Sequence, residues 1–282
     1  ITADAGNVVS GGTLVLNGGT GTFNSTLDKL NELIVKNATL NVMSDTQAGE
    51  TGGGLSLDGG ATVNVGAGKT LTVIGTLGNS GNDNIITGAG SLALKDGVSV
   101  DAVLSKIGNV NVAGNSTVKI NKTADIIGNL TVGSSSSLLF NGGTVGGTLD
   151  VDGVMTVAGD TTAANVKNDG AISINADTVF TLTGDIDTGA SFKGTNLSSV
   201  LRLAGNATGT LNLNSGSGFA GTIRIGHGTL TVNTTDPVGA IEFIDDQGGM
   251  LNIAKELTVG SIKTAGLNQI TGIGTLSING SG

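Results

Sequence analysis

The chain has 282 residues, a net charge of -9 at pH 7, no cysteine and a single proline. The lack of cysteine excludes a disulfide scaffold and any thiolate metal site, and the acidic balance argues against a nucleic-acid partner, which needs clustered Lys and Arg. Val, Leu and Ile recur throughout, which argues against a disordered chain, because burial of their side chains offsets the entropy lost on folding.

The first segment that needs interpretation is Ser25–Lys36, with the sequence STLDKLNELIVK. Leu27, Leu30 and Ile34 recur at helical spacing, and Ser25 is a suitable residue to cap a helix N-terminus. We expect strand and loop here, with a short helix flanking the main fold as the alternative.

From Leu71 onward, short apolar segments recur at a nearly constant interval. Successive positions of one series differ in number by 21, 18, 20 and 19: Leu71, Leu92, Val110, Leu130 and Leu149. A second series lies between these positions, with differences of 20, 17 and 17: Val118, Leu138, Met155 and Ile172. Later positions continue at intervals of 19 to 21: Leu211, Leu230 and Leu251, then Leu257 and Leu276. A period of about 20 residues is typical of a solenoid, with at least two short strands in each coil.

Within each strand, apolar and polar residues alternate. In GTLDV, Leu149 and Val151 point to one side while Thr148 and Asp150 point to the other. Gly-rich dipeptides supply the turns between strands. Stacked coils would align the apolar side chains in an interior and the polar ones on an outer wall. We therefore predict an all-β fold, a right-handed parallel β-helix with coils of about 20 residues, as one domain over residues 1–282.

Two other folds share part of this pattern. A leucine-rich repeat has a similar period, but it needs a fixed Asn or Cys column and a helical convex side, whereas the second half of each period here is another strand. A β-sandwich or barrel also has many short strands, but it does not need a constant stacking period and usually contains more proline and aromatic residues.

Two short motifs resemble ligand sites. GAGKT (66–70) resembles part of a phosphate-binding loop, but Val63 stands where the motif needs its first glycine and a strand follows instead of a helix, so we expect a turn. GNSGNDNII (78–86) resembles one calcium-binding nonapeptide, with Asp83 as the ligand, but the next nine residues lack the aspartate. We favour a turn there as well and expect no metal.

Histidine and the clustered acidic residues are the candidates for catalytic groups. His227 is the only histidine, and no G-x-S-x-G elbow accompanies it, so we expect an exposed turn residue. The segment EFIDDQ (242–247) brings three carboxylates together, as a glycan-processing site would require, but an exposed acidic loop explains the same residues. We predict no catalytic residue and no cofactor.

The segments GTLVLNGG, GAGKTLTV, GTLDVDG, GAISIN, GTLTVNTTDP and GTLSING resemble the passenger region of Gram-negative autotransporters, which use type V secretion, and in particular the rickettsial surface-antigen outer membrane proteins. The resemblance covers nearly the whole chain and rests on patterns of the fold. It implies a location at the bacterial cell surface and outer membrane, export through a C-terminal β-barrel, and a role in adhesion to or invasion of host cells. We also expect the chain to be a passenger fragment without signal peptide or translocator barrel. The resemblance implies that such a passenger is attached to the membrane only through a C-terminal barrel outside this fragment.

Two hypotheses of function follow. The first is a non-enzymatic surface rod that contacts a host cell-surface protein, or that serves as a spacer or surface-layer segment; it needs no small-molecule substrate. The second is a β-helix glycan-active enzyme, which would need a groove with two carboxylates at about 5 Å or about 6.5–9.5 Å and a basic sugar-binding residue. A uniform wall of Thr, Asn and Ser would favour the first.

Specificity in a repeat protein often lies in loops that interrupt the period. Three segments do so most clearly and are predicted to leave the solenoid as loops: Met43–Gly53, Thr183–Ser199 and Thr234–Gly249. Their acidic side chains are the candidate partner-binding residues: Asp45, Glu50, Asp185, Asp187, Asp236, Glu242, Asp245 and Asp246. Their charge predicts a basic or polar patch on the partner.

Overall fold

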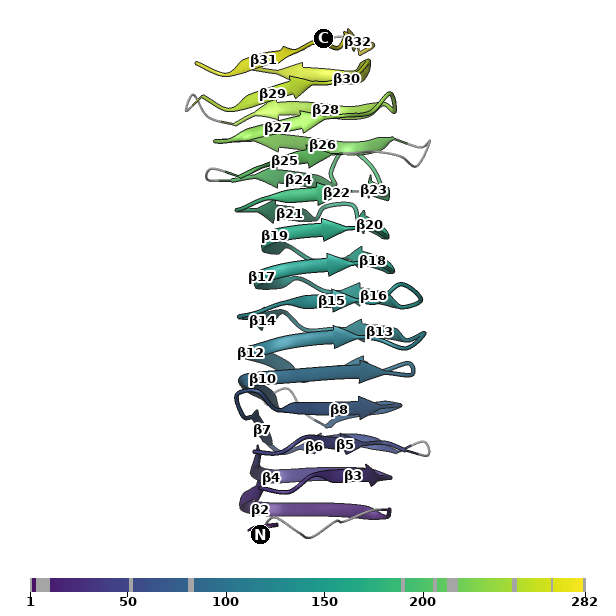
Figure 1. Ribbon diagram of the computed structural model, residues 1–282, viewed down its shortest axis with the longest axis vertical. Coiled ribbons are helices and arrows are strands. Elements are labelled where there is room, and N and C mark those ends of the chain that lie inside the picture. The colour runs from purple at the N-terminus through teal and green to yellow at the C-terminus, as the bar shows by residue number, and fades with distance from the viewer. Residues whose placement is uncertain are drawn as a thin grey trace. The chain divides into compact units, whose positions relative to one another are not determined.

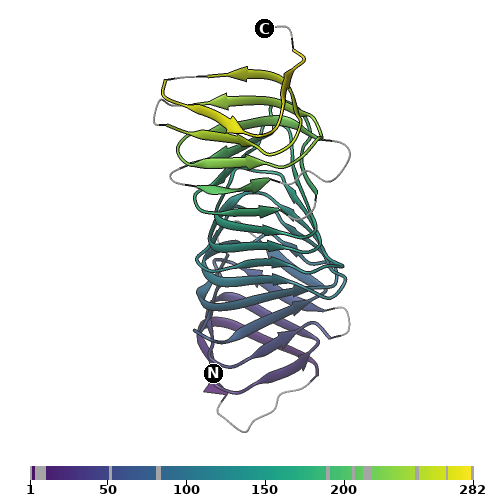
Figure 2. The ribbon, with the colours of Figure 1, turned by 45° about the horizontal axis from the view of Figure 1, so that its top comes forward.

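The computed structural model describes residues 2–3, 11–50, 53–80, 84–188, 191–204, 207–211, 218–244, 248–264 and 266–280. All regular elements within these ranges are β-strands, which stack in parallel as a β-solenoid with coils of about 20 residues (Figures 1 and 2). The predicted parallel β-helix is therefore confirmed. In the same ranges, no helix has the length and hydrophobicity needed to cross a membrane.

The solenoid divides into two compact units, residues 1–144 and 145–282. The first unit contains β1 (Thr2–Ala3), β2 (Thr13–Phe23), β3 (Leu27–Leu30), β4 (Glu32–Val42), β5 (Thr46–Ala48), β6 (Gly54–Asp58), β7 (Thr62–Val65), β8 (Thr70–Ile74), β9 (Thr76–Ser80), β10 (Ile85–Lys95), β11 (Ser99–Val100), β12 (Val103–Val112), β13 (Thr117–Ile120), β14 (Ala124–Ile126), β15 (Leu130–Val132) and β16 (Ser137–Phe140).

The strand β17 (Gly143–Val151) begins at the end of the first unit. The second unit continues with β18 (Val154–Val157), β19 (Thr161–Asn168), β20 (Ala171–Ile174), β21 (Val179–Leu182), β22 (Ile186–Thr188), β23 (Ser191–Gly194), β24 (Val200–Leu203), β25 (Thr208–Leu211), β26 (Phe219–Ile225), β27 (Thr229–Val232), β28 (Val238–Phe243), β29 (Met250–Ile253), β30 (Leu257–Lys263), β31 (Gln269–Gly272) and β32 (Leu276–Ile278).

In the first unit, each coil contributes strands to several parallel walls. One wall pairs β2, β4, β6 and β9, and another pairs β3, β5, β8, β10, β12 and β15. The long strand β4 turns a corner at Asn37, whose φ is +46°: the residues before it pair with β6 and those after it pair with β7. Asparagine tolerates this left-handed conformation better than most side chains do, so it suits the corner.

The predicted column of apolar residues in the first unit is confirmed. Leu71 pairs with Leu92, Leu92 with Val110, and Val110 with Leu130. All four side chains are fully buried. The segment Ser25–Lys36 forms parts of β3 and β4, so the expectation of strand rather than helix is also confirmed.

In the second unit, β21, β24, β26, β28 and β30 form one wall, and β22, β25, β27, β29 and β31 form another. Leu230 pairs with Leu251 as predicted, but Leu211 pairs with Val232, so its predicted place in that column is wrong. The reason is that Gly209, which has no apolar side chain to mark it in the sequence, lies opposite Leu230.

The interior is filled by Leu, Val, Ile and Ala together with all six phenylalanines of the chain. Because the chain also has no Trp or Tyr, no ring of Phe, Tyr or Trp is exposed for a sugar to stack on. The alternation of inward apolar and outward polar residues thus leaves a wall composed mostly of Thr, Ser, Asn and charged side chains, with single exposed apolar residues such as Val15 and Val154.

The predicted turn in GAGKT is confirmed: the amide of Lys69 donates to the carbonyl oxygen of Gly66 at 3.0 Å, and β8 begins at Thr70. His227 lies between β26 and β27 as predicted, but it is half-buried rather than exposed. Asp83, the calcium ligand considered above, lies outside the described residues.

Candidate functional site

The three segments that were predicted to leave the solenoid as loops contain strands of its walls, so this part of the prediction is wrong. Met43–Gly53 contains β5, Thr183–Ser199 contains β22 and β23, and Thr234–Gly249 contains β28. The strand β5 was missed because its inward positions hold Thr46 and Ala48 rather than large apolar residues.

Several candidate acidic residues connect neighbouring coils. The Asp45 carboxylate accepts a hydrogen bond from the backbone amide of Thr70 at 2.9 Å, and that of Asp185 accepts from the hydroxyl of Thr208 at 2.6 Å. These bonds stabilise the stacking, and they still leave both aspartates exposed.

The remaining candidates are dispersed. Glu50 and Asp187 are exposed, and Asp236 is half-buried. Asp245 and Asp246 lie outside the described residues. Among the candidates that the structure describes, Glu242 belongs to a cluster of charged side chains.

That cluster lies on the outer wall of the second unit, on the successive strands β24, β26, β28 and β30 (Figure 1). We call it the charged ladder; its members, in register from strand to strand, are Arg202, Arg224, Glu242 and Lys263. Arg224 donates from Nε to Glu242 Oε2 at 2.8 Å, and Lys263 donates from Nζ to Glu242 Oε1 at 2.7 Å. Glu242 therefore holds one cation on each side.

The two cations determine the acid–base character of Glu242. Hydrogen bonds from Lys263 and Arg224 hold the pKa of the Glu242 carboxyl below its usual value, although partial burial acts in the opposite direction. A general acid in a glycosidase needs a raised pKa so that it carries a proton near neutral pH. The environment of Glu242 therefore favours an ionised carboxylate and does not suit the role of proton-donating general acid.

A second cluster surrounds Lys167 in β19. Its ammonium lies 2.9 Å from an oxygen of Asp169, 3.3 Å from one of Asp150 and 3.9 Å from one of Asp152. Hydrogen bonds and charge attraction from Asp169 and Asp150 raise the pKa of Lys167. Among the described residues, no group of three or more His, Asp or Glu side chains is arranged to hold a metal ion.

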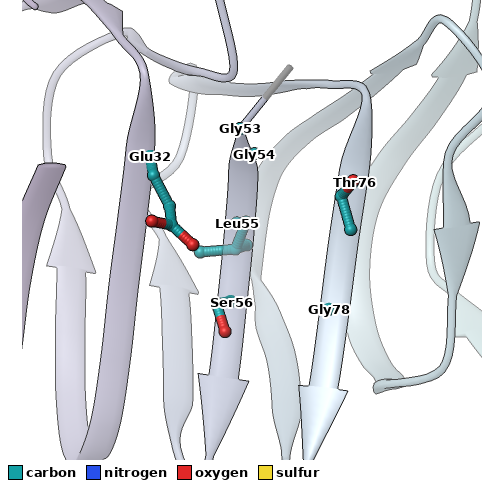
Figure 3. A pocket seen from close by; sticks show the side chains of 7 residues that line it. All are labelled: Glu32, Gly53, Gly54, Leu55, Ser56, Thr76 and Gly78. Atoms are coloured by element: carbon teal, nitrogen blue, oxygen red, sulfur yellow. The ribbon is translucent and has the colours of Figure 1, made fainter. Parts of the chain in front are cut away.

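Shallow grooves cross the coils of the first unit. One has a volume of about 160 Å³. Gly54 pairs in register with Glu32, and Gly78 pairs with Ser56. The groove is hollow because the two glycines carry no side chain at these outward positions. Figure 3 shows the Glu32 side chain extending from β4 toward β6 at this groove. A second groove, of about 260 Å³, includes Asp45 among its lining residues: Thr26, Leu27, Asp45, Thr46, Gln47, Thr70 and Thr72.

The polar wall is ordered along the stacking direction. In the first unit, Thr20 pairs with Thr39 and Thr39 with Thr62. Beside them, the amide of Asn64 donates to Asn41 Oδ1 at 3.2 Å. Similar bonds join outward residues elsewhere, for example Thr231 and Asn252 at 3.2 Å. The wall therefore presents polar groups in fixed columns rather than as independent surface side chains.

Sequence reasoning identified Glu242 but missed its partners in the charged ladder. A usable signal was present, because Arg202 and Arg224 are the only arginines of the chain and each stands at the outward position of an alternating strand. Lys263 carried no such signal, since it ends β30. No family model, curated protein or solved structure matches the chain.

Proposed function

We propose that the chain is a surface-exposed passenger solenoid of autotransporter type, and that it acts in adhesion to or invasion of host cells by binding a host cell-surface protein. The observation that carries this proposal is the outer wall, on which Thr, Asn and charged side chains stand in register over successive coils. The bacterial cell surface is the location that goes with this function.

A wall of this kind suits recognition more than catalysis. Neighbouring coils hold its polar side chains by hydrogen bonds, as between Asn64 and Asn41, so less conformational entropy is lost when a partner binds. Open grooves cross several strands, which gives an extended contact area rather than one deep pocket.

The proposal is tested by coating beads with the purified chain and counting beads bound to cultured mammalian epithelial cells. We expect more binding than with beads that carry the heat-unfolded chain, and competition by the soluble folded chain. Equal binding by folded and unfolded chain would contradict recognition by the wall. Lack of binding by both would favour the spacer or surface-layer role for this segment.

A further inference from the structure

The two arginines of the chain occupy equivalent positions on adjacent coils. Arg202 in β24 pairs in register with Arg224 in β26 on the outer wall of the second unit. Parallel strands lie about 4.8 Å apart, so the two side chains leave the wall side by side. Like charges placed directly opposite each other in a sheet are destabilising, and this arrangement therefore has a cost in stability.

The surrounding charges only partly offset that cost. On the far side of Arg224, Glu242 accepts from both Arg224 and Lys263 and so divides one negative charge between two cations. On the other side, Arg202 pairs in register with the uncharged Thr181. Arg202 is exposed, and no ion pair joins it to the described part of the chain. The charged ladder has three cations and one anion, in a chain whose net charge is -9.

We propose that Arg202 and Arg224 together bind an oxyanion, the carboxylate or sulfate group of an acidic sugar on a cell-surface glycan. This inference rests on the proposed function in adhesion and names the chemistry of one contact. A guanidinium presents planar, paired N–H donors that match such groups in a bidentate manner. Arg224 uses its Nε for Glu242, and its terminal nitrogens take no part in that bond.

Other features of the chain define the size and type of the ligand. The negative net charge disfavours a long polyanion such as a nucleic acid, whereas a single oxyanion within about 8 Å of the arginines is governed mainly by their local field. All phenylalanines are interior, so the contact relies on charge and hydrogen bonds rather than on stacking. A terminal acidic sugar satisfies both conditions.

The test measures binding of the full chain to immobilised glycoconjugates that carry sialyllactose, sulfated lactose or lactose. We expect binding to one or both acidic conjugates and little to lactose, which also distinguishes carboxylate from sulfate. In the variant Arg202→Gln/Arg224→Gln, we expect the affinity to fall about tenfold, the loss of charge-assisted hydrogen bonds being of this order. The matched control is Lys119→Gln/Lys193→Gln, which changes the net charge equally at exposed positions of β13 and β23 and should keep the affinity.

Further variants separate binding from folding. Arg202→Gln alone leaves both bonds of Glu242 intact and should still weaken binding, while Glu242→Gln should strengthen it because Arg224 and Lys263 are released. Full binding by the double arginine variant, or an equal loss in the lysine control, would overturn the inference. If the chain binds cells but none of these conjugates, the inference is overturned and the adhesion proposal stands.

Discussion

The ring of Phe192 packs edge-on against the ring of Phe180 in the interior of the second unit, with ring centroids 6.1 Å apart and ring planes at 73°. On its other side, Phe192 lies 6.0 Å from the ring centroid of Phe219. All three rings are fully buried. Since they belong to β21, β23 and β26, they link strands of different walls across the coil interior.

We predict that Phe192→Ala lowers the free energy of unfolding by about 3–5 kcal/mol, because it leaves a cavity and removes two aromatic contacts. Phe192→Leu fills most of the space and should be clearly less damaging. Urea unfolding followed by circular dichroism would measure both. Equal losses for the two variants would show that cavity volume does not determine the effect.

A second pair of variants tests the inward and outward assignment in β10. Leu92 is fully buried in the apolar column and its neighbour Ala93 faces outward. Leu92→Asp would bury an unpaired carboxylate, and we expect it to cost several kcal/mol, roughly 3 or more, whereas Ala93→Asp should cost about 1 or less. Thermal unfolding of both variants at neutral pH is the measurement, and similar losses would contradict the assignment.

Two glycines line the groove of Figure 3, and we expect their replacement by alanine to have different effects on stability. A Cβ at Gly54 would collide with the carbonyl oxygen of Thr76 in the backbone of the next coil, so Gly54→Ala should cost roughly 1–3 kcal/mol. At Gly78 the closest atom would be Ser56 Oγ at 3.7 Å, and φ is not positive. Gly78→Ala should therefore be neutral or stabilise the fold by up to about 1 kcal/mol. Melting temperatures of the two variants would decide; loss of stability in Gly78→Ala equal to that in Gly54→Ala would be the contrary result.

The charged ladder predicts a pH dependence. The folded-state pKa of Glu242 is held below its ordinary value of 4.5, so the folded chain binds a proton less readily than the unfolded chain does. The stabilisation is therefore fully present above the unfolded-state pKa and is lost as the pH falls through the lower, folded-state pKa. The partners are partly exposed, with 75% of the Lys263 side chain and 40% of the Arg224 side chain accessible. We therefore expect the charge of Glu242 to contribute about 1 kcal/mol or less to the free energy of unfolding.

Comparison with Glu242→Gln measures this effect. The melting temperature of the original chain should exceed that of the variant at about pH 7, and the difference should shrink as the pH approaches about 3. A difference that does not change with pH would exclude the carboxylate charge as its source.

The sequence was sufficient to predict the parallel solenoid and much of its interior, because inward side chains are large and apolar and recur in every coil. Leu71, Leu92 and Val110 mark their column although the two intervals between them are unequal. Where an inward position holds a small residue, as Gly209 does in β25 and Ala48 in β5, the pattern is lost and the strand is misplaced or taken for a loop.

Strand alternation in the sequence shows that Arg202 and Arg224 face outward. The register of the charged ladder could not be predicted, because it depends on the length of every turn in between. The interval from Arg202 to Arg224 is longer than the interval from Arg224 to Glu242, and the interval to Lys263 differs from both. No constant period aligns these residues. The outward face also has no repeated apolar pattern from which the register between strands of successive coils could be assigned. Only the stacked backbone shows that these residues lie in register on successive coils.

Parallel pairing of each strand with the strands one coil before and one coil after has a consequence for how such a chain can evolve. The bonds that hold Leu230 reach back to β25 and forward to Leu251, and none needs a distant part of the sequence. Duplication or loss of one complete coil of about 20 residues therefore preserves every other pairing and changes only the number of coils. Natural variants of such a chain should differ in length by whole coils, with the columns of their interiors unbroken.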